Sequence, residues 1–321
     1  MSTTEVRPDE LRGVTWTTEK ALKFQRRSML VVTVAPLIAL VFAIVQLWGS
    51  GLSATDAWIA LVTYTLTALG ITVGYHRYFT HRSFTAKRSL ELVMAVLGSM
   101  AIQGSLIDWV ATHRRHHYYS DRPGDPHSPH AEFEGDGIKG ALKGLFHAHV
   151  GWMFRGDQTV REEWAPDLLD DPTLVKVDRA FPRLVIASLA FPAVLGLVFT
   201  GSLWGAFTAF IWGGALRMFL LHHVTWSINS ICHYYGTRPF ESRDEARNNL
   251  PMALLSMGEG WHNGHHAFPA SARHGLRWWE LDVSWLTIRT LKAVRLVTDV
   301  KLPSATQLER RTRKKAAAKA A

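Results

Sequence analysis

The sequence predicts an all-α membrane protein in which four transmembrane helices form two hairpins below a cytoplasmic helical cap. Two observations predict this class. Four apolar runs each approach the roughly 20 residues that a helix needs to cross a bilayer, and clustered histidines lie at or beyond the ends of those runs. The chain has 321 residues, 47% of them hydrophobic, which is typical of a folded protein rather than a disordered or fibrous one.

Short loops pair the four predicted spans, which cover residues 29–48, 57–75, 184–200 and 203–228. The segment GSGLSATD joins the first pair, and little more than Gly-Ser joins the second. Connections this short predict antiparallel neighbours, and therefore two helical hairpins.

Basic residues predict the orientation of the spans. KALKFQRRS (residues 20–28) precedes the first span, and the long segment 77–183 is rich in Lys and Arg. The positive-inside rule then places both termini and that segment in the cytoplasm. We expect residues 1–28 to be a cytoplasmic N-terminal segment, residues 29–303 to form the membrane domain, and residues 304–321 to be a basic tail.

A further apolar stretch, residues 92–107, is short for a crossing and contains Gln103. Such a stretch suits a buried or interfacial helix. If it crossed the membrane, the histidines before and after it would lie on opposite sides and could not share a site. We therefore expect it to lie against the cytoplasmic interface.

Composition excludes several functions. The net charge of +9 is accompanied by no recognised nucleic-acid-binding motif, so no nucleic-acid partner is expected. Cys232 is the only cysteine, which excludes intramolecular disulfides, cysteine-ligated zinc and iron–sulfur clusters. GDGIKG (residues 135–140) matches a dinucleotide-binding glycine pattern, but no strand precedes it, and we expect a flexible loop.

Three histidine clusters carry metal-ligand spacing: HRYFTH, HRRHH and HNGHH. Helical spacing of three and four residues puts all three imidazoles of H-x-x-H-H on one face. The five-residue spacing in HRYFTH is less regular, so we expect that helix to change course or leave the membrane there. The clusters comprise His76, His81, His113, His116, His117, His262, His265 and His266.

Eight imidazoles indicate two metal ions. Structural zinc is satisfied by four ligands and catalytic zinc by three plus a water, and the H-E-x-x-H pattern of zinc proteases is absent from the sequence. Imidazole also suits copper and nickel, so the spacing by itself does not select iron. The carboxylates of Asp108, Asp121 and Glu259 are candidates to orient the ligands.

From about Ala68 to Gly275 the chain resembles the membrane acyl-CoA desaturases of the stearoyl-CoA type. The resemblance rests on ALGITVGYHRYFTHRSF, THRRHHYYSDRPGDPH, HVGW, TWSINSICHYYGTRPF and GEGWHNGHHAFPASARHG, which match that family in order and spacing. It implies a site for two iron ions, with His233 as a ninth histidine ligand and a water held near one iron by Asn229.

The resemblance also implies the reaction. We expect an enzyme that uses O₂ to insert a cis double bond, at the delta-9 position, into a long saturated acyl chain while O₂ becomes water. No cytochrome-like or flavin module is visible, so the electrons would come from a separate ferredoxin, flavin reductase or cytochrome. The alternatives are a histidine-ligated hydroxylase or oxygenase acting on an alkane or lipid, and a non-enzymatic haem or metal-binding membrane protein.

Substrate residues are expected along the second and fourth spans. Tyr64 and Ala68 share a helix face, roughly 18 and 12 Å before His76, a depth that suits the methyl end of an acyl chain with Tyr64 as its stop. The other expected substrate residues are Gln103, Trp109, Thr225 and Trp226.

The acyl carrier is CoA or a lipid. At polar positions where the acyl-CoA enzymes hold the CoA head group, this chain has Gly104, Ala111 and Thr112. Phosphates would still find basic partners in Arg114, Arg115 and Arg122.

Overall fold

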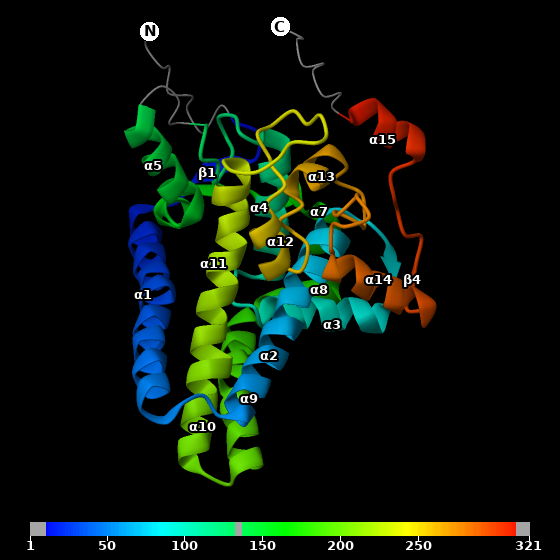
Figure 1. The fold of residues 1–321 in the computed structure, drawn as a ribbon. Helices are drawn as coiled ribbons and strands as arrows, with labels where there is room; N and C mark the ends of the chain where they lie inside the picture. Colours follow the sequence, from blue (N-terminus) through cyan, green and yellow to red (C-terminus); the bar gives the residue numbers. More distant parts are fainter. Residues whose placement is uncertain (1–10, 132–136, 313–321) are drawn as a thin grey trace, which may run out of the picture.

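The structure is a computed structural model that describes residues 11–131 and 137–312. A stem of long helices carries a cap of shorter helices and loops at one end, and the described chain begins and ends on the cap side (Figure 1). The described strands form two small antiparallel sheets. They pair β1 (Val14–Trp16) with β3 (Asp157–Thr159) and β2 (Thr85–Ala86) with β4 (Val297–Thr298). The predicted all-α class is confirmed.

Four continuous helices of the described chain are long and apolar enough to cross a membrane, as the sequence predicted. The first is α1 (Glu19–Ser50), the second is α2 (Ala54–Leu69) continued by η2 (Gly70–Thr80), and the third is α9 (Phe181–Thr200). The fourth runs through α10 (Leu203–Ala209), η4 (Phe210–Leu216), α11 (Arg217–Ser230) and η5 (Ile231–His233). α1 begins at Glu19, where the Thr18 side chain accepts a bond from the backbone N–H of Ala21.

Both pairs of spans are joined by short turns, but only one pair packs closely. α9 packs along α10, and Gly201 adopts a left-handed φ of 63° in the turn between them. α1 instead packs against η4 and α11, with Ala43 beside Ile211 and Leu216. The Thr63 hydroxyl donates to the Gly213 carbonyl at 3.0 Å and fastens α2 to η4. The fourth span is thus the centre of the stem.

The second span reaches the cap as a π-helix, in which backbone bonds join residues five apart. The His81 N–H donates to the His76 carbonyl at 3.2 Å, and His81 caps the helix. We expected this helix to change course or leave the membrane here, and the structure has a wider π turn that brings residues five apart onto one side. The spacing of HRYFTH therefore matches the helix that carries it.

The cap consists of short elements arranged around the end of η2. Its helices are α3 (Arg88–Ser99), α4 (Leu106–Tyr119), α5 (Gly137–His149), η3 (Gly151–Phe154), α6 (Arg161–Trp164), α7 (Pro166–Leu169), α8 (Pro172–Arg179), α12 (Leu250–Leu255), α13 (His262–Ala267), α14 (Val283–Ala293) and α15 (Ala305–Arg311). Residues 92–107 are divided between α3 and α4 and do not form a span. Residues 137–140 open α5, so the loop expected there is wrong, whereas residues 135 and 136 lie outside the described chain.

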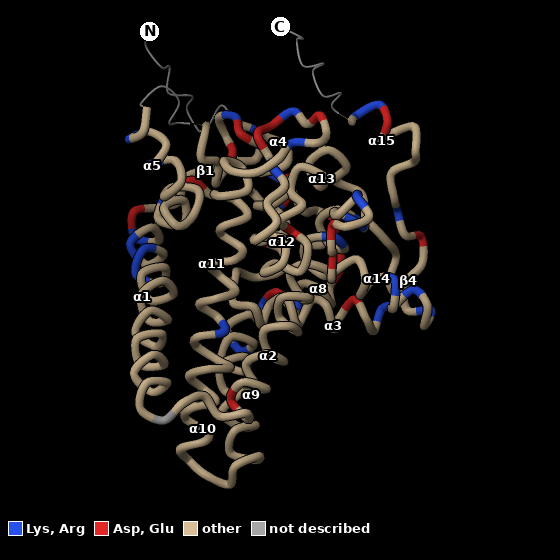
Figure 2. The backbone as a smooth tube through the Cα atoms, in the orientation of Figure 1, with Lys and Arg blue, Asp and Glu red and all other residues tan. Residues whose placement is uncertain are grey.

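Charged residues gather in the cap and at the cap end of α1, and few lie in the stem (Figure 2). Two stem charges are buried with polar partners. The Thr208 hydroxyl donates to Asp56 at 3.0 Å, and the Arg217 guanidinium donates to the Ser188 hydroxyl at 2.7 Å. Burial with such partners lowers the cost of a charge in a membrane.

Candidate metal centre

Two groups of histidine nitrogens converge where η2, α4, η5 and α13 meet. One group comprises His76, His81, His113, His117 and His265, and the other comprises His116, His233, His262 and His266. Within each group the ring nitrogens lie within 4.8 Å of one another. The structure thus brings together all nine histidines that were expected as ligands.

Helix geometry divides each H-x-x-H-H cluster between the two groups. On α4, His113 and His117 are one turn apart and enter the first group, while His116 points to the second. On α13 the division is reversed, with His262 and His266 in the second group and His265 in the first. Residues adjacent in a helix point about 100° apart, so two short helices supply ligands to two neighbouring sites.

Within each group, ring nitrogens lie close enough together to share a proton or a cation. Nε2 of His76 lies 3.1 Å from Nε2 of His265, and Nε2 of His233 lies 3.0 Å from Nε2 of His262. Nδ1 of His76 contacts Glu259 and Nδ1 of His233 contacts Asp121, so in each of these rings the proton belongs on Nδ1. Their Nε2 atoms then face the Nε2 atoms of His265 and His262, an arrangement that a bound cation stabilises. The residues fit two metal ions.

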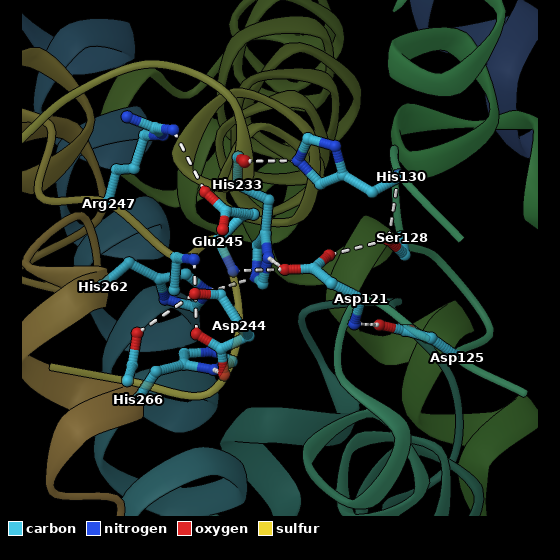
Figure 3. A network of polar contacts seen from close by, with 12 residues as sticks. Asp121, Asp125, Ser128, His130, His233, Asp244, Glu245, Arg247, His262 and His266 are labelled. Atoms are coloured by element: carbon cyan, nitrogen blue, oxygen red, sulfur yellow. Dashed lines mark hydrogen bonds and ion pairs between the residues drawn. The ribbon is translucent and has the colours of Figure 1, made fainter. Parts of the chain in front are cut away.

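Carboxylates contact the Nδ1 atom of four candidate ligand rings. Besides the two pairs above, Nδ1 of His116 lies 3.0 Å from Asp125 and Nδ1 of His266 lies 2.7 Å from Asp244. Figure 3 shows Asp121 and Asp244 pointing at their histidines from two different loops. Asp121 is itself fixed by the Ser128 hydroxyl and the Glu245 N–H. Such contacts fix the orientation and the tautomer of a metal-binding ring.

Two of the three carboxylates expected to orient ligands contact candidate ligand rings. Asp121 and Glu259 are confirmed in this position, but Asp108 forms an ion pair with Arg161 at the other end of α4. Sequence reasoning missed Asp125 and Asp244. Asp125 follows a histidine cluster closely, in DRPGDPH, which is a usable signal, whereas nothing in the local sequence marks Asp244.

Electrostatics keeps these carboxylates ionised and several ligand rings neutral. Burial opposes the ionisation of Asp125, but the charge and hydrogen bond of His116 outweigh it and lower the pKa of Asp125 to about 2. Burial is also the main cause that lowers the pKa of His262 and of His265 far below the ordinary value, with help from neighbouring imidazoles. Neutral imidazole is the form that binds metal.

A model of the fatty acid desaturase family matches residues 53–289. This chain belongs to the fatty acid desaturase family. It is 42% identical over 285 residues to a hex-5-enoyl-[acyl-carrier protein] acetylenase of Moorena producens (strain JHB), covering 89% of both chains. It is 39% identical over 252 residues to delta-9 acyl-lipid desaturase 1 of Arabidopsis thaliana, covering 78% of this chain and 77% of the relative. It is 38% identical over 247 residues to an sn-1 stearoyl-lipid 9-desaturase of Anabaena variabilis, covering 76% and 83%.

A cavity of about 570 Å³ leads to the histidines of this desaturase, which is an integral membrane protein. Its lining includes five of the six expected substrate residues together with Asn229: Ala68, Gln103, Trp109, Thr225 and Trp226. The Gln103 amide donates to the Thr225 hydroxyl at 2.9 Å and ties α11 to the loop before α4. His76, His113 and His262 also line the cavity, so it reaches both histidine groups.

Three expected contacts differ in the structure. Tyr64 is absent from the described lining of the cavity, and its hydroxyl donates to the Leu255 carbonyl at 2.9 Å, so its expected role as the stop of the chain is not supported. Arg114 is bound to Asp167, and Arg115 to Asp157. These two guanidinium groups are occupied within the protein rather than offered to phosphates.

Two histidines outside the nine lie against the centre. Nδ1 of His274 is 3.3 Å from Glu259, and the His127 ring packs against His116 at 4.4 Å between ring centroids. Arg77 is fully buried and binds both Glu259 and Asp282. Through Arg77 and Glu259, the segment before α14 is tied to the metal ligand candidate His76.

Proposed function

We propose that this desaturase holds two iron ions in its paired histidine groups and inserts a cis double bond into a long saturated acyl chain, at the delta-9 position. The observation that carries the proposal is the cavity, whose mostly apolar wall ends at both histidine groups. Its volume of about 570 Å³ is within the range of about 300–1,000 Å³ that encloses small ligands. The two metal sites would be on the cytoplasmic side of the membrane, and a separate donor protein would supply the electrons.

Iron and O₂ would supply an oxidant strong enough to remove hydrogens from an unactivated methylene, which no side-chain base can deprotonate. The protein's own contribution is ligation, aim and exclusion of water. Carboxylates hold the protons at Nδ1 of four rings, so that Nε2 is free to bind metal. The cavity wall fixes the chain, and the methylenes beside the histidines are the ones that react.

The delta-9 position draws support from two relatives, whose names describe 9-desaturation of lipids. A second candidate product is a triple bond, because the acetylenase relative is 42% identical over most of both chains. An acetylenase would remove two further hydrogens from an enoyl chain at the same site. The substrate and the product therefore separate the two candidates.

Lipid analysis of a host that expresses the protein tests the proposal. We expect new cis-monoenoic chains with the double bond at carbon 9, and their absence when His117→Ala is expressed at the same level. Alkynyl chains would establish the acetylenase, and hydroxylated chains would establish the oxygenase alternative. A fatty acid profile identical to that of the empty host would contradict the proposed function.

A further inference from the structure

The substrate cavity has one wall made by two spans that do not pack along each other. Met29 and Val32 of α1 line it, and so do Phe181 and Val185 of α9. These four side chains are only partly buried. α1 packs on η3, η4 and α11, whereas α9 packs on α10, η4 and α2. The cavity therefore meets the surface of the stem between the cap-side ends of α1 and α9.

The basic residues around this opening indicate its depth in the membrane. On α1, Lys23, Arg26 and Arg27 come immediately before the apolar run that begins after Ser28. On α9, the exposed Arg183 lies within the first turn, between Phe181 and Val185. Figure 2 shows the basic end of α1 just above the uncharged part of the stem. Because such residues mark the membrane interface, the opening lies at the top of the cap-side leaflet, where the acyl chains join their head groups.

The wall of the cavity carries no Lys or Arg among its described lining residues. Its polar groups near α1 are neutral: the Gln25 amide donates to the Met153 carbonyl at 2.8 Å, and its oxygen accepts from Gln158 at 3.0 Å. Asp108, the carboxylate in the wall besides Glu259, is paired with Arg161. A carrier with several phosphates, such as CoA, is held most firmly by cations that point into its site, whereas Arg27 and Arg183 are exposed beside the opening and do not line the cavity. A neutral edge suits the ester groups of a glycerolipid.

We propose that this opening is a lateral portal through which an acyl chain enters while it is still esterified to a glycerolipid of the cap-side leaflet. The inference rests on the proposed function and names its substrate class. The glycerol backbone stays at the neutral edge by Gln25 and Ser28, and the head group remains in the bilayer near Arg27 and Arg183. Only one acyl chain leaves the membrane, to lie along α11 toward His76 and His262.

Competing carriers give the first test. Iron-loaded, full-length protein in nanodiscs is supplied with reduced ferredoxin and, in separate arms, with isotope-labelled distearoyl-phosphatidylglycerol in the bilayer, stearoyl-CoA or stearoyl-acyl carrier protein. We expect the double bond in the intact labelled lipid. Product only from stearoyl-CoA or only from the carrier protein would overturn the portal and leave the desaturase standing. No product in any arm would overturn the proposed function, and the portal with it.

Blocking the portal gives a second test that needs neither iron nor a donor. Photoactivatable phosphatidylglycerol, with the reactive group at the end of one chain, should label peptides of α2 and α11 around Ala68 and Leu221 in the wild-type protein. Val185→Trp, or Met29→Trp from the other side, should reduce this labelling by about tenfold, because an indole fills the gap. The matched controls Ile186→Trp and Val31→Trp replace exposed neighbours outside the lining. Wild-type labelling in folded variants of both portal positions would overturn the proposal.

Discussion

At the scale of single residues, each orienting carboxylate does two things for its histidine: it sets the ring angle and it holds the proton on Nδ1. Asp244 is the clearest case, because its other oxygen accepts the backbone N–H of Ala246 and so has little freedom to move. The Nε2 atom of His266 is buried and has no protein partner. The ring is therefore held ready for a metal before one arrives.

We expect Asp244→Asn to lower iron affinity by about 10- to 100-fold, because the neutral amide holds the His266 ring and its proton less firmly. The measurement is iron content per chain during titration with a chelator. Asp170→Asn, at an exposed carboxylate in the cap, is the matched control. Equal iron retention in both variants would show that Asp244 only shapes its loop.

Asn229 lines the cavity four residues before His233, and His262 of the second histidine group lines the same cavity. If its amide holds a water beside that group, Asn229→Leu removes the water and leaves every histidine in place. We expect activity to fall by about tenfold or more, as for other catalytic hydrogen-bond groups, with iron content nearly unchanged. Equal losses of iron and activity would instead make Asn229 a structural support of the ligands.

Ala68 is buried in the cavity wall on the second span, whereas Tyr64, one turn farther from His76, is bound to Leu255. We therefore expect Ala68→Leu to shift the products toward shorter chains, since added volume in a closed wall displaces the last carbons. Tyr64→Phe should leave the chain-length profile unchanged. Gas chromatography of the products decides, and an unchanged profile for folded Ala68→Leu would place the end of the chain elsewhere.

At the scale of elements, the π-helix explains why sequence reasoning treated HRYFTH as irregular. Ordinary helical spacing pairs residues three and four apart, whereas η2 pairs residues five apart and brings His76 and His81 into one group. The five-residue spacing matches the π turn. A π-helix is rare, although it often occurs at functional sites. Because it is rare, a five-residue spacing alone does not predict it.

The glycines of η2 let α3 approach it closely. A methyl group on Gly70 would lie 2.4 Å from the backbone nitrogen of Gly98, which has no flexible side chain to move aside. We expect Gly70→Ala to lower the free energy of unfolding by about 1–3 kcal/mol through overpacking. Gly49→Ala meets nothing within 4 Å and is the control. Equal thermal stability of the two variants in detergent would mean that α3 shifts without cost.

At the scale of the whole molecule, hydropathy predicted all four spans, and histidine spacing predicted eight of the nine histidines that the structure gathers into two groups, with His233 added by the family resemblance. These signals are periodic and local. The contacts that were missed, such as Asp244 with His266 and Tyr64 with Leu255, join residues that only the folded chain brings together. The packing of α1 on η4 rather than on α2 was missed for the same reason, because a short loop limits distance but does not choose the neighbour.

The buried histidines also link metal binding to the stability of the whole protein. Among the nine candidate ligands, burial, helped by neighbouring imidazoles, lowers the pKa of five far below the ordinary value: His81, His113, His117, His262 and His265. In the unfolded chain each has a pKa of about 6.5. As the pH falls below about 6.5, the unfolded chain therefore takes up protons that the folded protein does not, and folding is destabilised.

We expect the thermal midpoint of the metal-free protein in detergent to fall steadily from about pH 7 to about pH 5, with up to about 1.4 kcal/mol lost per pH unit for each such histidine. The carboxylates contribute little in this window, because their pKa in the unfolded chain is about 4. Iron bound to the folded state alone should shift the fall toward lower pH. A midpoint that is flat over this window in the metal-free protein would mean that these histidines are hydrated and protonate within the folded state.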